Sequence, residues 1–291
     1  MVLIALLLIF FYLLYVVQPI FESAKVETRN SVKLTNASQV VGVGMEEQTE
    51  VAFLLGETGN VDFYNIEKDH FGKKITTLNT ELPSDVSSFA SSAPFQGQYA
   101  YGLENGSVVV VAPKFLVTFP NNQRQLTPRL DYPLGDMALE VDDQGAAITK
   151  FAFSHYEDKT AVVALTADKR VLFSSFVGEE NMFTGEVEWV VERTELDIEG
   201  RVDELLISPD TTRTFVRSAN QIYVYDTRYP SEVEQIQLLA ANEENANLVS
   251  TQLLAGANSL MLANDNGEVS QWFEVNTENG REFQKIREFE P

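Results

Sequence analysis

Apolar runs separated by short polar turns recur along most of the chain. Five segments share one pattern, in which an apolar strand, a polar turn and a second strand that opens with Val or Ile follow one another. These segments are 51–66, 99–113, 161–176, 213–227 and 260–275. Their turns are rich in Gly, Asn and Asp, which tolerate the positive φ that a tight hairpin requires. The pattern therefore predicts β-hairpins.

Further apolar runs flank the hairpins. One precedes each hairpin, at 39–45, 86–92, 148–154, 202–210 and 248–256. Another follows most of them, at 73–79, 187–195, 234–240 and 283–290. Each repeating unit is thus expected to hold four strands.

The spacing of the units indicates their architecture. The residues that open the second hairpin strand are 47 to 63 positions apart, and they are Val61, Val108, Val171, Ile222 and Val269. Four-stranded blades of a β-propeller recur at roughly 40 to 50 residues, and insertions lengthen some of them. We therefore expect an all-β fold, a WD40-like β-propeller of four-stranded blades over residues 39–291. The visible units either close a five-bladed ring or belong to an incomplete seven-bladed ring with blades beyond Pro291.

A blade that is apolar on both faces must stack on its neighbours, because it cannot cover itself. The large side chains of the strands are therefore expected to pack between blades. They are Phe63, Tyr64, Phe173, Tyr223, Tyr225, Trp272 and Phe273.

Three stretches depart from the repeat. Residues 113–145 hold four of the ten prolines and are predicted to be a long connection, and 177–189 form an acidic excursion. Residues 239–248 fit either a short helix or a loop.

The first 21 residues carry no charged side chain. About 20 apolar residues suffice for a helix that crosses a bilayer, so residues 1–21 are predicted to be a transmembrane helix, with 22–38 as a linker. A cleavable signal peptide is the alternative. The basic residues Lys25, Arg29 and Lys33 after the segment would place the remainder in the cytoplasm, unless a basic leader precedes the segment.

Composition narrows the chemistry. The formal net charge of −22 disfavours binding to nucleic acid, and the absence of cysteine excludes disulfides, thiol catalysis and thiolate metal sites. His70 and His155 do not have the spacing of metal ligands. A hydrolytic triad is also not expected from Ser154, His155, Glu157 and Asp158, because consecutive strand residues point to opposite faces.

Acidic runs at 140–145, 242–245 and 264–268 could offer oxygen ligands to calcium, but none follows the twelve-residue calcium loop. Arg124 and Arg129 are too sparse for anion capture. The sequence therefore predicts no catalytic residue, metal or cofactor, and favours protein binding over enzyme activity.

The apolar stretch "LIALLLIFFYLLYVVQPIF", followed by an acidic, cysteine-free repeat region, resembles the N-terminal part of the long gammaproteobacterial form of PstC-type permease subunits of phosphate ABC transporters. The resemblance implies a membrane helix followed by an extracytoplasmic β-propeller that acts as a docking or regulatory platform in phosphate uptake. The implied location is the inner membrane, with the propeller in the periplasm. The implied partners are the second permease subunit, the ATPase subunit and a periplasmic phosphate-binding protein.

Two other functions remain open. The chain could be a free-standing, membrane-anchored β-propeller scaffold of the cell envelope. The third reading is a calcium-dependent propeller phosphohydrolase.

Overall fold

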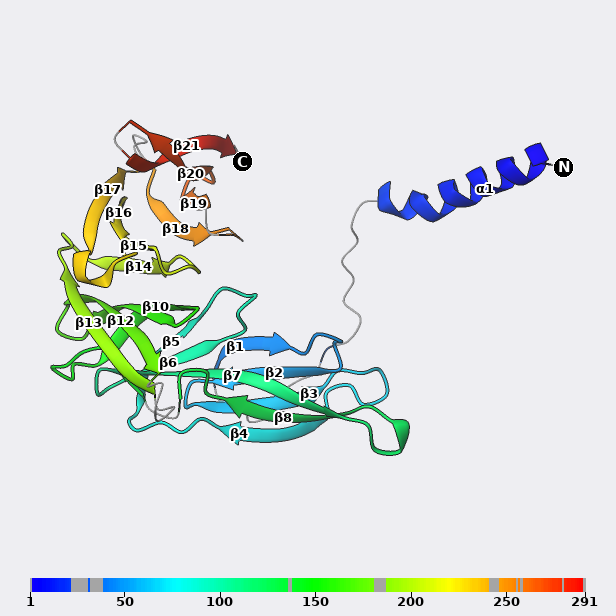
Figure 1. Ribbon diagram of the computed structural model, residues 1–291, viewed down its shortest axis with the longest axis horizontal. Coiled ribbons are helices and arrows are strands. Elements are labelled where there is room, and N and C mark those ends of the chain that lie inside the picture. Colours follow the sequence, from blue (N-terminus) through cyan, green and yellow to red (C-terminus); the bar gives the residue numbers. More distant parts are fainter. Residues whose placement is uncertain are drawn as a thin grey trace. The chain divides into compact units, whose positions relative to one another are not determined.

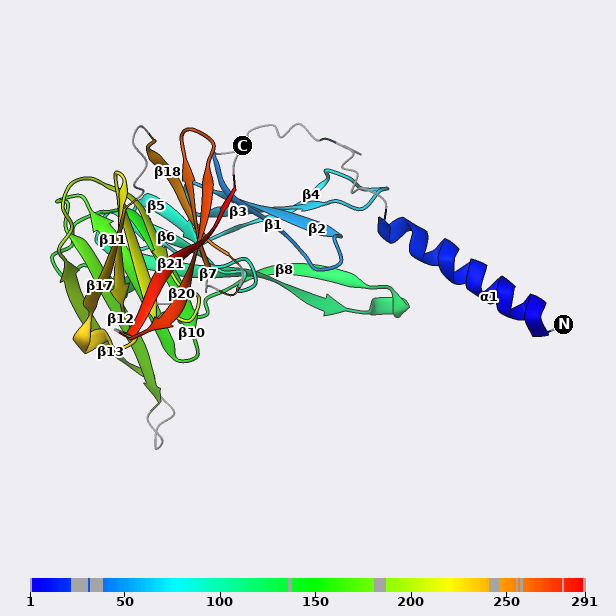
Figure 2. The ribbon, with the colours of Figure 1, turned by 90° about the horizontal axis from the view of Figure 1, so that it is seen from above.

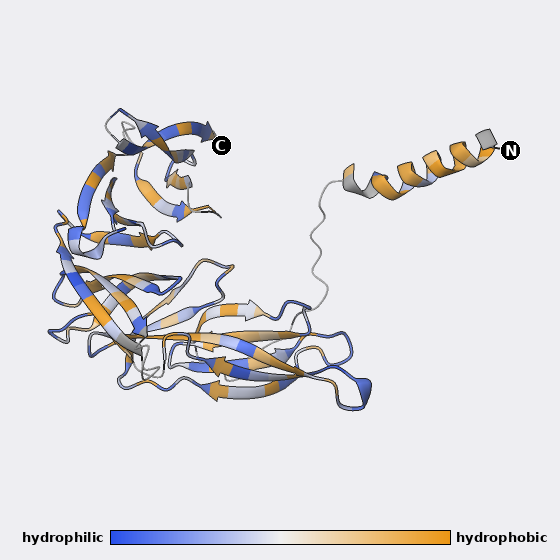
Figure 3. Ribbon diagram, viewed as in Figure 1, coloured by the Kyte–Doolittle hydropathy of each residue, from blue (hydrophilic) through white to orange (hydrophobic). Residues whose placement is uncertain are grey.

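The computed structural model describes residues 2–21, 31, 39–135, 138–180, 187–240, 246–254, 256, 259–278 and 280–289. The chain divides into two units, Met1–Thr35 and Asn36–Pro291, each of which is considered by itself. The first unit contains helix α1 (Val2–Val17) and one turn of 3-10 helix, η1 (Gln18–Phe21). Figure 3 shows that most of the coloured part of α1 is hydrophobic.

The prediction of a transmembrane helix over residues 1–21 is not confirmed. Within the described part of the chain, no helix is both long enough and apolar enough to cross a bilayer. The 16 residues of α1 rise by about 24 Å at roughly 1.5 Å per residue, whereas the hydrocarbon core is about 30 Å thick.

The second unit consists of five antiparallel sheets that follow one another in chain order (Figure 1). The first sheet contains β1 (Val40–Met45), β2 (Val51–Gly56), β3 (Asn60–Asn65) and β4 (Lys74–Asn79). The second contains β5 (Val86–Ser91), β6 (Tyr99–Leu103), β7 (Ser107–Thr118), β8 (Gln125–Asp131) and the short β9 (Leu139–Glu140), which pairs with β7.

Each of the remaining three sheets has four strands that pair in chain order. The third contains β10 (Ile148–Tyr156), β11 (Lys159–Thr166), β12 (Val171–Glu180) and β13 (Val187–Leu196). The fourth contains β14 (Val202–Ile207), β15 (Arg213–Ser218), β16 (Gln221–Asp226) and β17 (Glu234–Ala240). The fifth contains β18 (Leu248–Leu253), β19 (Ser259–Asn264), β20 (Val269–Thr277) and β21 (Gly280–Phe289). Short 3-10 turns, η2 (Pro120–Asn122) and η3 (Pro230–Glu232), lie in the hairpins of the second and fourth sheets.

The predicted hairpins and the strands before them are confirmed in all five sheets, and the strands after them are confirmed in the four sheets for which they were predicted. The prediction that 113–145 is a long connection is wrong, because β7 continues to Thr118 and β8 pairs with it over Gln125–Asp131. Within the acidic excursion, β12 runs on to Glu180, and residues 181–186 lie outside the described part. Residues 241–245 of the helix-or-loop segment also lie outside it.

Neighbouring sheets share their hydrophobic cores. Phe63 of the first sheet and Tyr101 of the second are fully buried in one cluster, and Phe63 meets the ring of Phe115 edge-on at 5.8 Å between centroids. Other clusters join the second sheet to the third, the third to the fourth, and the fourth to the fifth. Burying one such side chain fully stabilises the fold by roughly 1.5–3 kcal/mol.

Strand β7 shows why the apolar runs are continuous. Val109 and Val111 pack into the cluster shared with the first sheet, whereas Val108 and Val110 pack into the cluster shared with the third. Successive side chains of a strand point to opposite faces, so both faces of this sheet are covered. The view in Figure 2, turned by 90°, shows the strands of the successive sheets from above.

The core clusters connect the sheets in series. Within the described residues, each of the four clusters joins a sheet to the next one along the chain, and none joins the fifth sheet to the first. The first and fifth sheets therefore each have one covered face.

Candidate interaction face

The antiparallel order of the strands gives every sheet two distinct ends. At one end lie the turn from the second strand to the third and the loop that leads to the next sheet, and we call this the cavity end. At the other end lie the turns from the first strand to the second and from the third to the fourth, and we call this the bridged end. The first four sheets have all of these connections, and the fifth has the same three turns.

Among the described residues, cavities of about 750, 870, 1010 and 670 Å³ open at the cavity end. The first lies between the first and second sheets, the second between the third and fourth, and the third between the fourth and fifth. The fourth lies beside β9 and the 81–83 segment. Their walls combine strand ends with hairpin turns and connecting loops, and the turns and loops are the segments that vary most freely on a β scaffold.

The first cavity is shaped by the contact of a hairpin turn with a connecting loop. Gly59, in the turn between β2 and β3, has φ +86°, and a Cβ there would lie 2.6 Å from Leu82 Cδ1. The backbone N–H of Thr80 donates to the carbonyl of Gly59 at 2.9 Å. Glycine is favoured at this position by its positive φ, and a Cβ would in addition displace the end of the Leu82 side chain.

At the cavity end, some charged side chains form ion pairs and others form none. Arg170 binds Asp142 and Asp168 at 2.8 Å each, and Arg217 binds Glu204 at 2.9 Å. Several exposed carboxylates that line the cavities take part in no ion pair among the described residues, and they are Glu57, Glu81, Asp85, Glu195, Asp197 and Glu199. This face therefore presents uncompensated negative charge.

Asp142 is a buried exception. Burial alone would raise the pKa of its carboxyl, but hydrogen bonds from Arg170 and from the backbone N–H groups of Ala146 and Gln144 outweigh burial. The pKa of Asp142 is therefore held below its usual value, and its side chain is completely enclosed. Asp142 belongs to the fold and is not available to a ligand.

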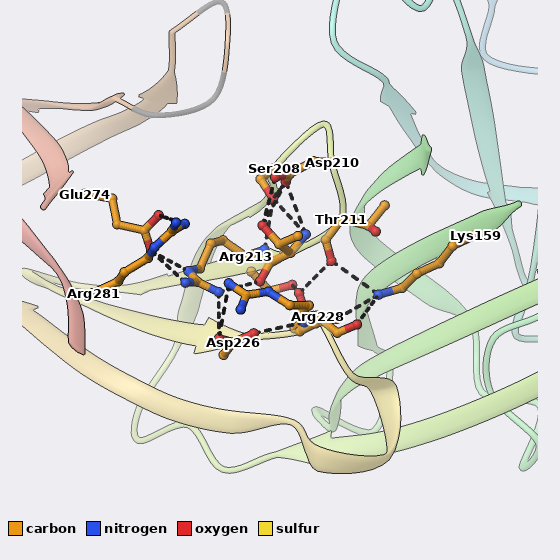
Figure 4. Close-up of polar contacts among 12 residues, drawn as sticks. Lys159, Ser208, Asp210, Thr211, Arg213, Asp226, Arg228, Glu274 and Arg281 are labelled. Atoms are coloured by element: carbon orange, nitrogen blue, oxygen red, sulfur yellow. Dashed lines mark hydrogen bonds and ion pairs between the residues drawn. The ribbon is translucent and has the colours of Figure 1, made fainter. Parts of the chain in front are cut away.

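At the bridged end, polar contacts cross every interface between neighbouring sheets. Arg124 of the second sheet binds Glu46 of the first at 2.5 Å, and Gln96 of the second donates to the carbonyl of His155 in the third at 2.7 Å. Figure 4 shows the next two interfaces. Lys159 donates to the carbonyl of Thr227 at 2.7 Å, and Arg213 binds Glu274 of the fifth sheet at 2.6 Å.

The central part of this network is well buried. Arg213 is 5% exposed and also binds Asp226 at 2.8 Å. Burial lowers the pKa of Lys159, although Asp210, Asp226 and Glu192 oppose the shift. Burial likewise lowers the pKa of His155, with Asp158 opposing. Lys159 and Arg213 join neighbouring sheets, whereas the imidazole of His155 contacts Thr160 of its own sheet.

The structure separates the predicted interblade residues into two groups. Phe63 lies in the core between the first two sheets, Phe173, Tyr223 and Tyr225 lie in the core between the third and fourth, and Trp272 packs against the core of the last two. Burial raises the pKa of Tyr225 to about 12, and its hydroxyl donates to the carbonyl of Asp197 at 2.9 Å.

Tyr64 and Phe273 lie outside all four core clusters, which differs from the prediction. Their chain neighbours Phe63 and Trp272 pack against the adjacent sheet, so alternation turns Tyr64 and Phe273 to the opposite face. That face is the uncovered one of the first or the fifth sheet, and Phe273 is 36% exposed.

The residues considered for chemistry are not brought together. Ser154 donates to the carbonyl of Pro209 at 2.9 Å, while His155 pairs with the hydroxyl of Thr160. Of the acidic runs, Asp142 holds Arg170 and Asp265 accepts hydrogen bonds from Asn247, whereas 242–245 lies outside the described residues. No group of three or more metal-ligating side chains is found in the described part of the chain.

Sequence reasoning did not identify the cavity-lining residues. Glu57, Thr80 and Asp85 belong to a turn and a loop that read only as polar connections. The position of each connection in the four-strand order could have indicated these residues. This order places every second-to-third turn and every loop between sheets at the cavity end.

Comparisons with known proteins bear on the fold. No family model matches the sequence, and no characterised protein matches it. Among solved structures, the β-propeller domain of Cps50 (Swd1) from Myceliophteria thermophila is similar with a TM-score of 0.50 and 10% sequence identity, over 90% of this chain and 74% of that one. A putative 6-phosphogluconolactonase from Bacteroides uniformis has a TM-score of 0.46 and 16% identity, over 84% of this chain and 70% of that one. Together with the five antiparallel sheets, of which four have four strands and the second also has the short β9, the first of these likenesses identifies the fold of the second unit as a WD40-like β-propeller fold.

Proposed function

We propose that this chain is a protein-interaction platform, and that the cavity end of its sheets is the surface that contacts the partner. The observation that carries the proposal is the location of the four cavities at one end, together with carboxylates that no cation of the described residues compensates. Complementary charge steers association and selects partners, so the expected partner surface is basic. The same negative charge disfavours nucleic acid and free phosphate as ligands.

The finer proposal rests on the sequence resemblance. The chain would be an accessory extracytoplasmic domain of a PstC-type phosphate transporter permease subunit, located at the inner membrane, with its sheets in the periplasm and the uncharged α1 in contact with the membrane. Its partners would be the second permease subunit, the ATPase subunit and a periplasmic phosphate-binding protein. Its role would be docking or regulation without enzyme activity of its own.

Site-specific photo-cross-linking in cells tests the platform. A photo-reactive amino acid is placed at Thr58, in the turn between β2 and β3 at the cavity end. The matched control places it at Gln48, in the turn between β1 and β2 at the bridged end. Both positions are exposed and polar, so they differ chiefly in the end that they report.

A discrete cross-linked product from Thr58 that is absent or much weaker from Gln48 supports the platform. Mass spectrometry of that product then distinguishes a phosphate-transport subunit from another envelope protein, and the latter would favour a free-standing scaffold. Equal cross-linking from both positions, or none from Thr58, would overturn the assignment of the contact surface.

A further inference from the structure

The cavity between the first and second sheets differs from the others in one respect. One of its lining residues, Thr80, has a buried hydroxyl oxygen without a hydrogen-bond partner among the described residues. Thr80 is 8% exposed, and its hydroxyl makes no hydrogen bond among the described residues. Buried hydroxyls are nearly always satisfied, so an orphan beside a cavity indicates a ligand group that would complete it.

The rim of this cavity is acidic. Glu57 comes from the turn between β2 and β3, and Asp85 comes at the end of the loop that enters β5. The backbone N–H of Glu104 donates to the carbonyl of Asp85 at 2.9 Å, which holds that loop against the second sheet. Neither carboxylate forms an ion pair within the described residues, and the cavity wall contains no Lys or Arg.

The remaining walls are largely apolar. Val41, Leu82, Val86 and Phe89 line the cavity of about 750 Å³. A Lys or Arg side chain combines an aliphatic stem that packs on apolar surface with a charged head that donates several hydrogen bonds. The apolar walls match the aliphatic stem of such a side chain. The unpaired carboxylates and the unpartnered hydroxyl of Thr80 match its charged head.

We propose that this cavity receives a Lys or Arg side chain of the partner protein, with the stem against the apolar wall and the cationic head near Glu57, Asp85 and Thr80. The proposal deepens the platform function and rests on it. It names a basic side chain as the feature of the partner that is recognised at the interface of the first two sheets.

The test uses the full 291-residue chain, purified in a mild deuterated detergent, and small probes observed by saturation-transfer NMR. The probes are N-acetyl-arginine methylamide, the corresponding lysine compound, and N-acetyl-citrulline methylamide, which keeps the shape of arginine without its charge. We expect the arginine or the lysine probe to bind at least fivefold more tightly than citrulline.

Variants locate the binding. The double variant Glu57→Gln with Asp85→Asn should bind the cationic probe at least fivefold more weakly. Glu47→Gln, an exposed carboxylate at the bridged end, should change this affinity less than twofold. Thr80→Val should weaken binding about threefold while leaving the thermal midpoint unchanged or raised, because the lost hydroxyl has no partner in the fold.

Three outcomes would overturn the proposal. The first is that the citrulline probe binds as tightly as the cationic probes. The second is that Glu47→Gln loses as much affinity as the double variant. The third is that neither the double variant nor Thr80→Val changes the affinity. Because the probes are tested on the purified chain, failure here is separable from failure of the platform, which the cross-linking in cells reports independently.

Discussion

The two ends of the sheets use charge in different ways. At the bridged end, the buried Arg213 and the partly buried Lys159 reach from one sheet to acceptors of the next. At the cavity end, carboxylates such as Glu57 and Asp85 stand exposed without a cation. Polar groups that hold a fold together are buried and paired, whereas groups available to a partner are exposed and unpaired. We therefore expect substitutions of the paired charges at the bridged end to lower the free energy of unfolding more than substitutions of the exposed carboxylates at the cavity end.

The largest expected effect is at the bridged end. Arg213→Met leaves Glu274 and Asp226 without their buried cation, and breaking such a pair costs about 3–5 kcal/mol of unfolding free energy. Urea denaturation of the full chain measures this loss. Arg201→Met at the cavity end is the control, because its pair with Asp203 has Arg201 88% exposed and should contribute at most about 1 kcal/mol. Equal losses would remove the distinction between the ends.

Asp142→Asn tests whether burial, and not the end itself, decides the effect. Asp142 lies at the cavity end but is enclosed, so we expect a loss of about 2 kcal/mol at neutral pH from the weakened pair with Arg170. The folded pKa of Asp142 is lowered, so its contribution is present above the unfolded pKa of about 3.9 and is lost as pH falls through the folded pKa.

The difference in unfolding free energy between the native chain and Asp142→Asn should therefore be constant from pH 7 to about 5 and shrink below about pH 4. Urea midpoints measured across this range provide the check. A difference that grows in acid would contradict the assigned pKa direction.

Gly59→Ala should cost about 1–2 kcal/mol, because alanine is strained at φ +86° and its Cβ would press on Leu82. Thermal melting measures the cost. Gly97→Ala is a matched control, since Gly97 also has positive φ but a Cβ there would meet no atom within 4 Å. An equal cost at both positions would show that backbone strain alone, and not the contact with the 80–86 loop, is responsible.

The smallest effect is expected for the exposed carboxylates of the first cavity. Glu57→Gln combined with Asp85→Asn should change the unfolding free energy by no more than about 0.5 kcal/mol, because neither side chain has an ionic partner in the described structure. Chemical denaturation checks this value. A clear loss would mean that these carboxylates support the fold, which would weaken their assignment to a partner.

The hairpins were predictable because their signals are local. Turn residues and apolar runs lie within about fifteen positions of one another, and the structure reproduces them in every sheet. Strand β8 was missed because the four prolines of residues 113–145 suggested a connection. Pro128 pairs opposite Phe115 in the outermost strand of its sheet, where a missing N–H is tolerated.

The candidate site could not be predicted in the same way. Glu57 and Thr80 are separated from one another along the chain, and the stacking of two sheets brings both to one cavity. The position of Tyr64 and Phe273 outside the core clusters also depends on long-range order, because among the described residues these clusters join the first and fifth sheets to a neighbour on one side only. Local patterns contain no information on which sheet is terminal.

The serial arrangement of the cores also implies an order of local opening. An inner sheet is held by two neighbours and a terminal sheet by one, so amide hydrogens of β1–β4 and β18–β21 should exchange with solvent sooner than those of β10–β17. The cavity beside Thr80 borders the first of these less protected sheets. A side chain that occupied it would slow fraying of that sheet by mass action, so occupancy and local order would rise together.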